Sequence, residues 1–441
     1  MVTAEPAETS LIERIFHLSS SNSTVSRELL GGLTTFMAMA YVVVVNPRIL
    51  GEAGMPIDGV IFATCLSSAI ATLVMGLWAN YPIALAPGMS LNAYFAYSIV
   101  QGRHVAWQTA LGVVFLSGAL FLVLTLTNIR EHIVNDIPDC LKHGTAAGIG
   151  FFIAFIGLRN AKMIVANPAT FVSMGKIADP EVVLAALGLI LIAILMSRRV
   201  AGALLIGIFA ITLAGIPLKL TTWPSHFFSL PQASGTFMKL DLRSASRLGL
   251  GELIFVFFFV DLFDNVGTLV GVCEQGGFLR DGKFPRASRA LLADAFGTMV
   301  GALTGTSTVT SYIESAAGVA AGARTGLGNL AIAGLFVAAM FCAPVVAAIP
   351  AYATAPALIL VGALMCGSLP KIRWNDFTEA FPAFMTMVTT PLTFSIATGL
   401  SVGLLSFTFL KLGTGRHREI SVLIWVLAVL FVLRYAFLGA E

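Results

Sequence analysis

Charged residues are scarce in this chain: Asp, Glu, Lys and Arg make up 11% of its 441 residues, whereas 57% are hydrophobic. A soluble domain of average composition has about a quarter charged residues. The deficit excludes an ordinary soluble protein, and lipid has to cover the apolar excess. The formal net charge is only +3, and no basic cluster is interleaved with aromatic residues, so we expect no nucleic-acid partner.

The patterns of a metal site, a disulfide framework and a signal peptide are also missing. The five cysteines are scattered without CxxC spacing, and none of the six histidines has a partner at metal-ligand spacing. We therefore expect no disulfide, no metal and no cofactor. The first residues, MVTAEPAETSLIERIF, lack a positive start and an early apolar core, so we expect no cleaved signal peptide.

Apolar runs fill most of the sequence instead. A membrane-spanning helix needs about 20 apolar residues. We predict fourteen spans, near 29–46, 58–78, 83–101, 107–127, 138–157, 181–197, 200–215, 250–272, 287–303, 309–323, 327–349, 353–369, 391–411 and 419–437. Residues 374–390 are interpreted as an interfacial amphipathic helix. The pair Arg198–Arg199 and the basic residues of 280–289 favour cytoplasmic termini.

The two halves of the chain share one hydropathy pattern. Adding about 222 to the numbers of the first-half spans brings most of them onto second-half spans. Seven spans per half is an odd number, so the halves must have opposite orientations. Inverted repeats of this kind are typical of secondary transporters, whose sites lie at the midplane between the repeats.

The third and tenth spans are broken at matching places. YPIALAPGMSLNAYFAY (81–97) contains Pro82, Pro87 and Gly88, which one continuous helix does not accommodate. GTSTVTSYIESAAG (305–318) is rich in β-branched residues that favour extended chain. We predict extended chain followed by a half-helix in both, with Ser311 as an N-cap. Broken backbone at membrane depth is tolerated where it is buried in protein or lines a wet cavity, so these segments indicate a binding site.

Acidic residues inside the predicted spans fall in spans eight to ten, where no Lys or Arg lies mid-span to neutralise them. They are Asp261, Asp264, Asp294 and Glu314. Charges at this depth are costly and usually functional. Asp264 and Thr268 are one turn apart and share a helix face. Each acid also has a structural interpretation: Asp264 as a partner of a neighbouring helix, Asp261 as a brace for broken backbone, and Asp294 as a group near a loop.

These residues give the chain a family resemblance. It resembles the purine permeases of the AzgA-like branch of the nucleobase–ascorbate transporter superfamily. The motifs that carry the resemblance are GGLTTFMAMAYVVVVNP (31–47), APGMSLNAYFAY (86–97), FVDLFDNVGTLVGV (259–272), TSTVTSYIESAAGVAAGARTGL (306–327) and PAFMTMVTTPLTFSIATG (382–399). They extend over nearly the whole chain.

The resemblance implies an all-α polytopic membrane protein. Its fourteen transmembrane helices would form two inverted seven-helix repeats, with short antiparallel strands in spans three and ten. The implied parts are a cytoplasmic tail (1–28), a core domain (29–127 and 250–349), a gate domain (138–215 and 353–437) and an extramembrane loop (216–249). The chain would lie in the plasma membrane (cell inner membrane), with both termini cytoplasmic. Homodimers are common in this fold.

The resemblance also implies a site for adenine, guanine or hypoxanthine together with a co-transported proton. The expected substrate-binding residues are Asp264, Glu314, Ile313, Leu91, Asn92, Thr268, Tyr312 and Phe95. Proton coupling or bracing would involve Asp261, Asp264 and Glu314. Relatives often have a second carboxylate or His where Thr268 stands, so the identity of the coupling group stays open. Coupling to sodium instead of a proton also stays open.

Elementary chemistry favours the same substrate class. A carboxylate accepts from the N–H donors of a purine edge, and in a low-dielectric pocket it binds a proton more readily than in water. The alternatives are an anion carrier or a uracil/xanthine-type transporter of the same fold. An anion site would need a cation beside the broken segments, and a channel would need a continuous polar lining. An aspartyl enzyme is excluded because Asp261 and Asp264, three apart on one helix, do not face each other across a substrate.

Overall fold

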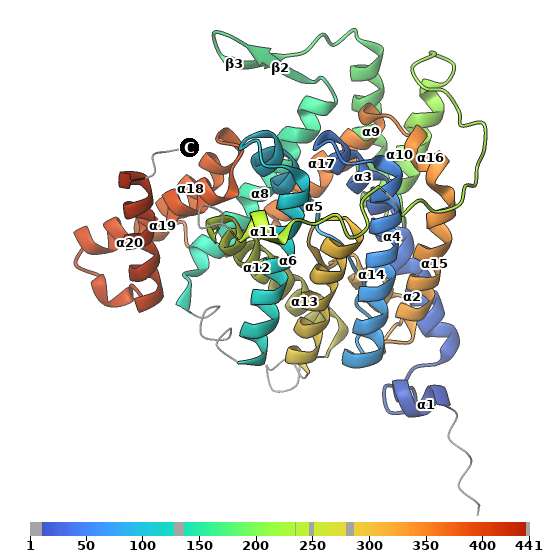
Figure 1. Cartoon of the computed structure of the whole chain (residues 1–441), viewed down its shortest axis with the longest axis horizontal. Coiled ribbons are helices and arrows are strands. Elements are labelled where there is room, and N and C mark those ends of the chain that lie inside the picture. Colours follow the sequence, from blue (N-terminus) through green and yellow to red (C-terminus); the bar gives the residue numbers. More distant parts are fainter. Residues whose placement is uncertain (1–10, 128–135, 234, 247–250, 279–285, 438–441) are drawn as a thin grey trace, which may run out of the picture.

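The computed structural model describes residues 11–127, 136–233, 235–246, 251–278 and 286–437, which form a mostly helical bundle (Figure 1). The expected cytoplasmic tail therefore lies partly outside the described residues, as do parts of the expected loop 216–249. Within the described chain, nine helices are long and apolar enough to cross a membrane. They are Val25–Glu52, Ile57–Ala79, Trp107–Leu126, Asp139–Asn160, Pro180–Ser197, Gly251–Cys273, Gly328–Ala348, Ala351–Lys371 and Ile396–Gly413.

The secondary structure alternates long helices with short irregular pieces. The first half has α1 (Leu11–Phe16), α2 (Val25–Met39), α3 (Val42–Glu52), α4 (Ile57–Val74), the π-helix η1 (Met75–Ala79), β1 (Leu85–Pro87), α5 (Met89–Ala93), the π-helix η2 (Tyr94–Gln101), α6 (Trp107–Leu126), α8 (Asp139–Asn160), β2 (Ile164–Asn167), β3 (Phe171–Met174), α9 (Pro180–Ser197) and α10 (Ala203–Gly215). The second half has α11 (Leu242–Ala245), α12 (Gly251–Gly276), α13 (Ala287–Thr304), β4 (Val309–Ser311), α14 (Ser315–Ala320), α15 (Gly328–Ala339), η4 (Met340–Cys342), α16 (Ala343–Ala348), α17 (Ala351–Met365), η5 (Cys366–Lys371), α18 (Phe377–Leu392), α19 (Ile396–Gly413), η6 (His417–Glu419) and α20 (Val422–Phe437).

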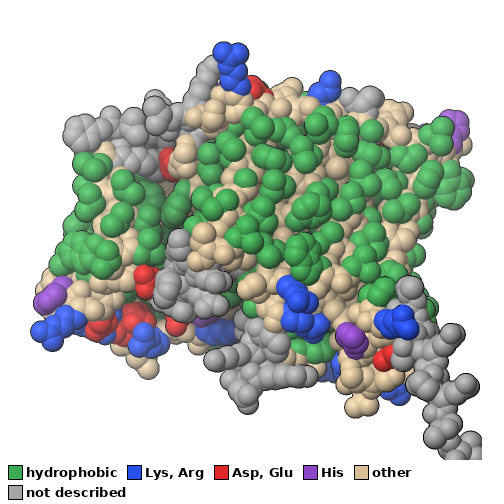
Figure 2. Space-filling view, turned by 60° about the horizontal axis from the view of Figure 1, so that its bottom comes forward, with side chains coloured by type: hydrophobic (Ala, Val, Ile, Leu, Met, Phe, Trp, Pro, Cys, Tyr) green, Lys and Arg blue, Asp and Glu red, His purple; other side chains and the backbone are tan. Residues whose placement is uncertain are grey.

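A broad apolar surface surrounds the bundle. Figure 2 shows hydrophobic side chains across the middle of one face, with Lys, Arg, Asp and Glu gathered towards its edges. Large apolar side chains are exposed along α9 and α20, among them Leu187, Ile190, Val429 and Leu433. Water would make this exposure unfavourable, whereas a bilayer makes it favourable because lipid is as apolar as the side chains. This surface and the long apolar helices together identify the chain as a multi-pass membrane protein.

The helices pack in two groups. In one group, α4 contacts α3, α13 and α15, α6 contacts α12 and α13, and α2 contacts α14 and α15. In the other, α8 contacts α17, α18 and α19, while α9 and α10 pack on α17. Small residues allow close approach in the second group: a Cβ on Gly150 of α8 would lie 2.5 Å from the carbonyl oxygen of Gly362 of α17. The segment expected at the membrane interface forms α18, which packs against α8 and α19.

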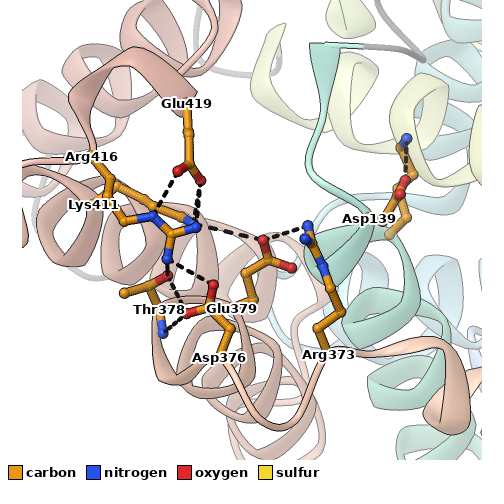
Figure 3. Close-up of polar contacts among 9 residues, drawn as sticks. Asp139, Arg373, Asp376, Thr378, Glu379, Lys411, Arg416 and Glu419 are labelled. Carbon is orange, nitrogen blue, oxygen red and sulfur yellow. Dashed lines mark hydrogen bonds and ion pairs between the residues drawn. The ribbon is translucent and has the colours of Figure 1, made fainter.

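An ionic network closes one end of α18 and α19 (Figure 3). Lys411 is fully buried, and its Nζ lies 2.7 Å from Glu419 Oε2 and 3.6 Å from Glu379 Oε1. Arg416 donates to Asp376 Oδ2 at 2.7 Å and to Glu419 at 2.6 and 2.9 Å. A buried ammonium is tolerable only with such partners.

Two short strands from opposite halves of the chain meet inside the first helix group. β1 pairs antiparallel with β4, with Leu85 opposite Ser311 and Pro87 opposite Val309. Both strands are completely buried. Each strand leads into a short helix, β1 into α5 and β4 into α14. The polypeptide is therefore interrupted in both of the segments whose sequences disfavour a continuous helix.

The expected N-cap at Ser311 is wrong. Helix α14 begins at Ser315, and the cap position is occupied by Glu314. Ser311 is instead the last residue of β4, because its pairing with Leu85 extends the strand to that point. The turn Tyr312–Glu314 then separates strand from helix, closed by a bond from Ser315 N–H to the Tyr312 carbonyl at 3.1 Å.

Candidate functional site

Side-chain amides and hydroxyls hold the first interrupted segment in place. Asn329 of α15 donates from Nδ2 to the carbonyl oxygens of Thr72, Tyr81 and Ile83 at 3.0–3.1 Å. The hydroxyl of Thr72 donates to the Leu85 carbonyl and accepts from the Leu85 N–H. These bonds replace the helical ones that the broken backbone lacks, as buried backbone groups require.

The second interrupted segment is tied to the first by its own backbone and side chains. Tyr312 donates its N–H to the Ala84 carbonyl at 3.0 Å and its hydroxyl to the Pro87 carbonyl at 2.5 Å. Ala84 N–H donates to the Ser315 hydroxyl at 3.0 Å. Tyr312, predicted as a substrate-binding ring, thus also bridges the two segments.

Asp264 and Glu314, both predicted to bind the substrate, come together beside these segments. Asp264 of α12 is partly exposed, and its carboxylate is hydrogen-bonded to the Ser90 hydroxyl of α5. Glu314 is partly exposed at the start of α14, and its Oε1 accepts from the Tyr41 hydroxyl at 2.8 Å. The two carboxylates lie close enough to interact electrostatically with each other and with Tyr312. The structure thereby brings α12 and α14 together at the strand pair.

One face of α12 beside the acids is open. Asp264, Thr268 and Gly271 are partly exposed, and Gly267 is exposed. A Cβ on Gly267 would meet no atom of the described residues within 4 Å, whereas one on Gly271 would lie 3.4 Å from Ile313 Cδ1. Spacings of three and four place these residues on one helix face. Ile313 is itself 49% exposed. The face offers room for a ligand next to Asp264.

The remaining predicted residues are buried. Leu91 and Phe95 belong to the main hydrophobic cluster and are inaccessible to solvent. Asp261 is 1% exposed on α12. Asn92 is fully buried on α5, and neither Nδ2 nor Oδ1 of its amide has a hydrogen-bond partner among the described residues. A buried amide without a partner is costly, which marks Asn92 as a group that a ligand can satisfy.

Three polar residues at or near this place were missed by the sequence analysis. They are Tyr41, Ser90 and Asn265. Asn265 is fully buried on α12 beside Asp264, and its amide has no hydrogen-bond partner in the part of the chain described. Ser90 and Asn265 lie inside quoted motifs, and Tyr41 is the polar aromatic of GGLTTFMAMAYVVVVNP, so position in a motif was the available signal.

The electrostatics of the site are acidic. Over the described ranges, neither Asp264 nor Glu314 takes part in a salt bridge. Among the same residues, no group of three or more His, Cys, Asp and Glu could hold a metal ion. The arrangement therefore offers hydrogen-bond acceptors, an amide and an open apolar face. That set suits a flat ligand rich in N–H donors better than an anion.

An apolar helical bundle that encloses a polar site at two interrupted segments defines a multi-pass membrane transporter. The model described as "Permease family" (Xan_ur_permease) matches residues 26–402, and the chain belongs to this family. Its members are transporters and not enzymes. The resemblance to the adenine, guanine and hypoxanthine permeases of the nucleobase–ascorbate transporters is confirmed by this match and by the full-length relatives below.

Several relatives align over almost their whole length. A permease of Methanocaldococcus jannaschii is 52% identical, and the alignment covers 97% of this chain and 99% of that one. The adenine permease AdeP of Escherichia coli is 42% identical over 100% of this chain and 99% of its own. The guanine/hypoxanthine permease PbuO of Bacillus subtilis is 44% identical over 95% and 99%.

Solved structures share the fold at low sequence identity. The transmembrane domain of the cyanobacterial bicarbonate transporter BicA superposes with a TM-score of 0.66 at 16% identity, covering 86% of this chain and 97% of that one. The murine anion transporter Slc26a9 in its inward-facing state gives a TM-score of 0.63 at 11% identity, covering 93% and 74%. At these identities the comparison establishes the fold alone.

Proposed function

We propose that this chain is a secondary active transporter that imports purine nucleobases, namely adenine, guanine or hypoxanthine. The observation that carries the proposal is the meeting of Asp264 and Glu314 beside the paired strands β1 and β4. Full-length relatives named adenine and guanine/hypoxanthine permeases support the same substrate class.

The proposed contacts follow from the chemistry of a purine. Its N–H donors meet the carboxylates of Asp264 and Glu314, and the Asn92 amide supplies both a donor and an acceptor. Thr268 and Ile313 line the open face of α12, where the base enters. Leu91, Phe95 and Tyr312 complete the proposed site as the apolar and aromatic wall against which the ring packs.

We propose that a proton accompanies the base. Asp264 or Glu314 takes up the proton, and Asp261 serves in coupling or bracing from its buried position on the same helix as Asp264. The loaded site then carries one negative charge less through the apolar interior, where an unpaired charge is expensive.

The proposed architecture is that of an elevator. Fourteen spans form two inverted repeats of seven, with the core domain (29–127 and 250–349) sliding against the gate domain (138–215 and 353–437). The two packed helix groups support this division. The chain lies in the cell inner membrane with both termini cytoplasmic, the loop 216–249 lies outside the membrane, and a homodimer is the proposed assembly.

A thermal-shift screen on the purified protein tests the substrate class. Adenine, guanine and hypoxanthine are expected to raise the melting temperature, whereas uracil, xanthine, ascorbate, sulfate and bicarbonate leave it unchanged. Stabilisation by bicarbonate or sulfate alone would contradict the proposal and favour the anion carrier. A response to uracil or xanthine alone would favour the transporter of those bases.

The carboxylates are tested by substitution. Asp264→Asn and Glu314→Gln should each reduce purine uptake into proteoliposomes at least a hundredfold, because an amide donates where the base needs an acceptor, while the melting temperature of the free protein stays near wild type. Asp139→Asn, at an exposed position on α8, is the matched control. Wild-type uptake in both site variants would remove these acids from the site, and uptake that ignores an imposed pH gradient would contradict the coupling.

A further inference from the structure

Tyr41 lies at the interruption between α2 and α3. Helix α2 ends at Met39 and α3 begins at Val42, which leaves Ala40 and Tyr41 in a turn. The Tyr41 side chain is 2% exposed, yet its hydroxyl is not in an apolar environment. It donates to Glu314 Oε1 at 2.8 Å, across 273 residues of sequence.

The contact helps to fix where the Glu314 carboxylate points, together with the bond from the backbone N–H of Glu314 itself. Glu314 stands at the N-cap of α14 but makes no side-chain bond that caps its own helix. Nor does it take part in a salt bridge within the described chain. The Tyr41 hydroxyl is thus the side-chain partner that the structure gives this carboxylate, and a hydroxyl bonded to a carboxylate is among the stronger hydrogen bonds.

We propose that Tyr41 is a positioning residue for the substrate: by holding one oxygen of Glu314, it fixes the plane of the carboxylate and presents a constant acceptor edge to the N–H donors of the base. This inference rests on the proposed function. It adds a residue of the first span to a site whose acids come from spans eight and ten.

The geometry also says which step the contact serves. Helix α2 packs on α14, so Tyr41 and Glu314 belong to the same packed group and move together when the groups shift. A contact that is kept throughout the transport cycle contributes to substrate binding and leaves the conformational step unchanged. Loss of the hydroxyl should therefore raise KM and not lower kcat.

Tyr41→Phe tests the inference because it removes the hydroxyl and keeps the ring. Uptake into proteoliposomes is measured with the purine that the wild type transports best. The KM of the variant is expected to rise about tenfold, the effect of one charge-assisted hydrogen bond. The value of kcat should stay within about twofold of wild type. Tyr352→Phe is the matched control, since Tyr352 is 4% exposed on α17 and its hydroxyl bonds to Thr221 at 2.7 Å, away from the acids.

A double-mutant cycle separates positioning from general damage. Glu314→Asp shortens the side chain by one methylene and so moves the carboxylate away from Tyr41, and the KM of this variant should also rise. The KM of the double variant should rise by less than the product of the two single increases. If Tyr41→Phe does not fold, Tyr41→Met, which also removes the hydroxyl, takes its place in the same KM measurement.

The outcomes distinguish the inference from the function beneath it. A wild-type KM in Tyr41→Phe, an equal effect in Tyr352→Phe, or a loss of kcat at unchanged KM would each overturn the role of Tyr41 while purine transport stands. Wild-type protein that transports no purine would instead overturn the proposed function and this inference with it.

Discussion

The Asn92 amide shows the conflict between stability and binding on the scale of one residue. Its two polar atoms are buried and, in the described structure, have no protein partner. Folding removes the amide from water and returns no hydrogen bond, so the side chain costs stability unless a ligand satisfies it. The function proposed above gives the amide its missing partner in the bound purine.

Asn92→Leu should therefore leave the melting temperature of the free protein equal to wild type or raise it, because no hydrogen bond is lost. Purine affinity should fall about tenfold or more, measured as the ligand-induced shift in melting temperature over a concentration series. A marked loss of stability without ligand would show that the amide has a structural partner.

At the scale of an element, the interrupted segments depend on side chains that replace helical hydrogen bonds. Asn329 is fully buried, and its one NH₂ group serves three carbonyls, that of Thr72 in the last turn of α4 and those of Tyr81 and Ile83 between η1 and β1. It is the structural counterpart of Asn92: the same side chain, equally buried, but with its donors satisfied.

Asn329→Leu should destabilise the protein by about 3 kcal/mol, because it leaves buried carbonyls without a donor. Thermal unfolding in detergent, compared directly with Asn92→Leu, measures the difference between the two amides. Equal stability of the two variants would contradict a bracing role for Asn329.

The ionic network at the ends of α18 and α19 has a pH dependence of definite sign. The Thr378 hydroxyl and Arg416 hold the pKa of Asp376 well below its usual range, and Arg416 and Lys411 lower the pKa of Glu419 to about 2. Because the folded state releases these protons more readily than the unfolded chain, the network stabilises fully above pH about 4.5. The contribution is lost as the pH falls from there towards 2.

The double variant Asp376→Asn/Glu419→Gln should accordingly melt at a lower temperature than wild type at pH 7. The difference in melting temperature between wild type and variant should narrow as the pH is lowered below about 4.5. Acid protonates the two carboxylates of the wild type and so removes the charges that the variant already lacks. A gap that is constant over this range would show that the two carboxylates contribute through packing and not through their charge.

The sequence predicted the interruptions and the acids because their signals are local. Pro82, Pro87 and Gly88 disfavour a continuous helix whatever surrounds them, and Asp264 and Glu314 are conspicuous in apolar runs. Tyr41 was missed because a tyrosine in an apolar run is equally compatible with core packing. Its proposed role rests on a contact with a residue 273 positions away, which no local pattern encodes. Ser311 was misassigned for the same reason, since its strand partner Leu85 lies in the other half.

At the scale of the whole molecule, polar contacts join the two helix groups at one end of the bundle. Arg159 of α8 lies 3.0 Å from Glu52 of α3, and Asn160 donates to the same carboxylate at 3.2 Å. The Arg159 guanidinium also lies 4.8 Å from the ring centre of Tyr97 on η2. These contacts are present in this arrangement of the two helix groups. A sliding movement of one group against the other would break them.

Glu52→Gln should therefore speed departure from this arrangement, and purine uptake should rise up to about fivefold, the limit for a half-exposed ion pair. Asp139→Asn, which breaks the Lys142–Asp139 pair within α8, is the control and should leave uptake unchanged. Uptake at the wild-type rate in Glu52→Gln would indicate that the Glu52–Arg159 contact is not rate-determining in transport.

The pairing of β1 with β4 has a consequence for folding during synthesis on the ribosome. In the bond from Tyr312 to Pro87, 225 residues separate donor from acceptor. The ribosome makes β1 long before its partner, so the edge of β1 can be paired only once Val309 to Ser311 have been made. We therefore expect a product truncated ahead of Val309 to lack the strand pair.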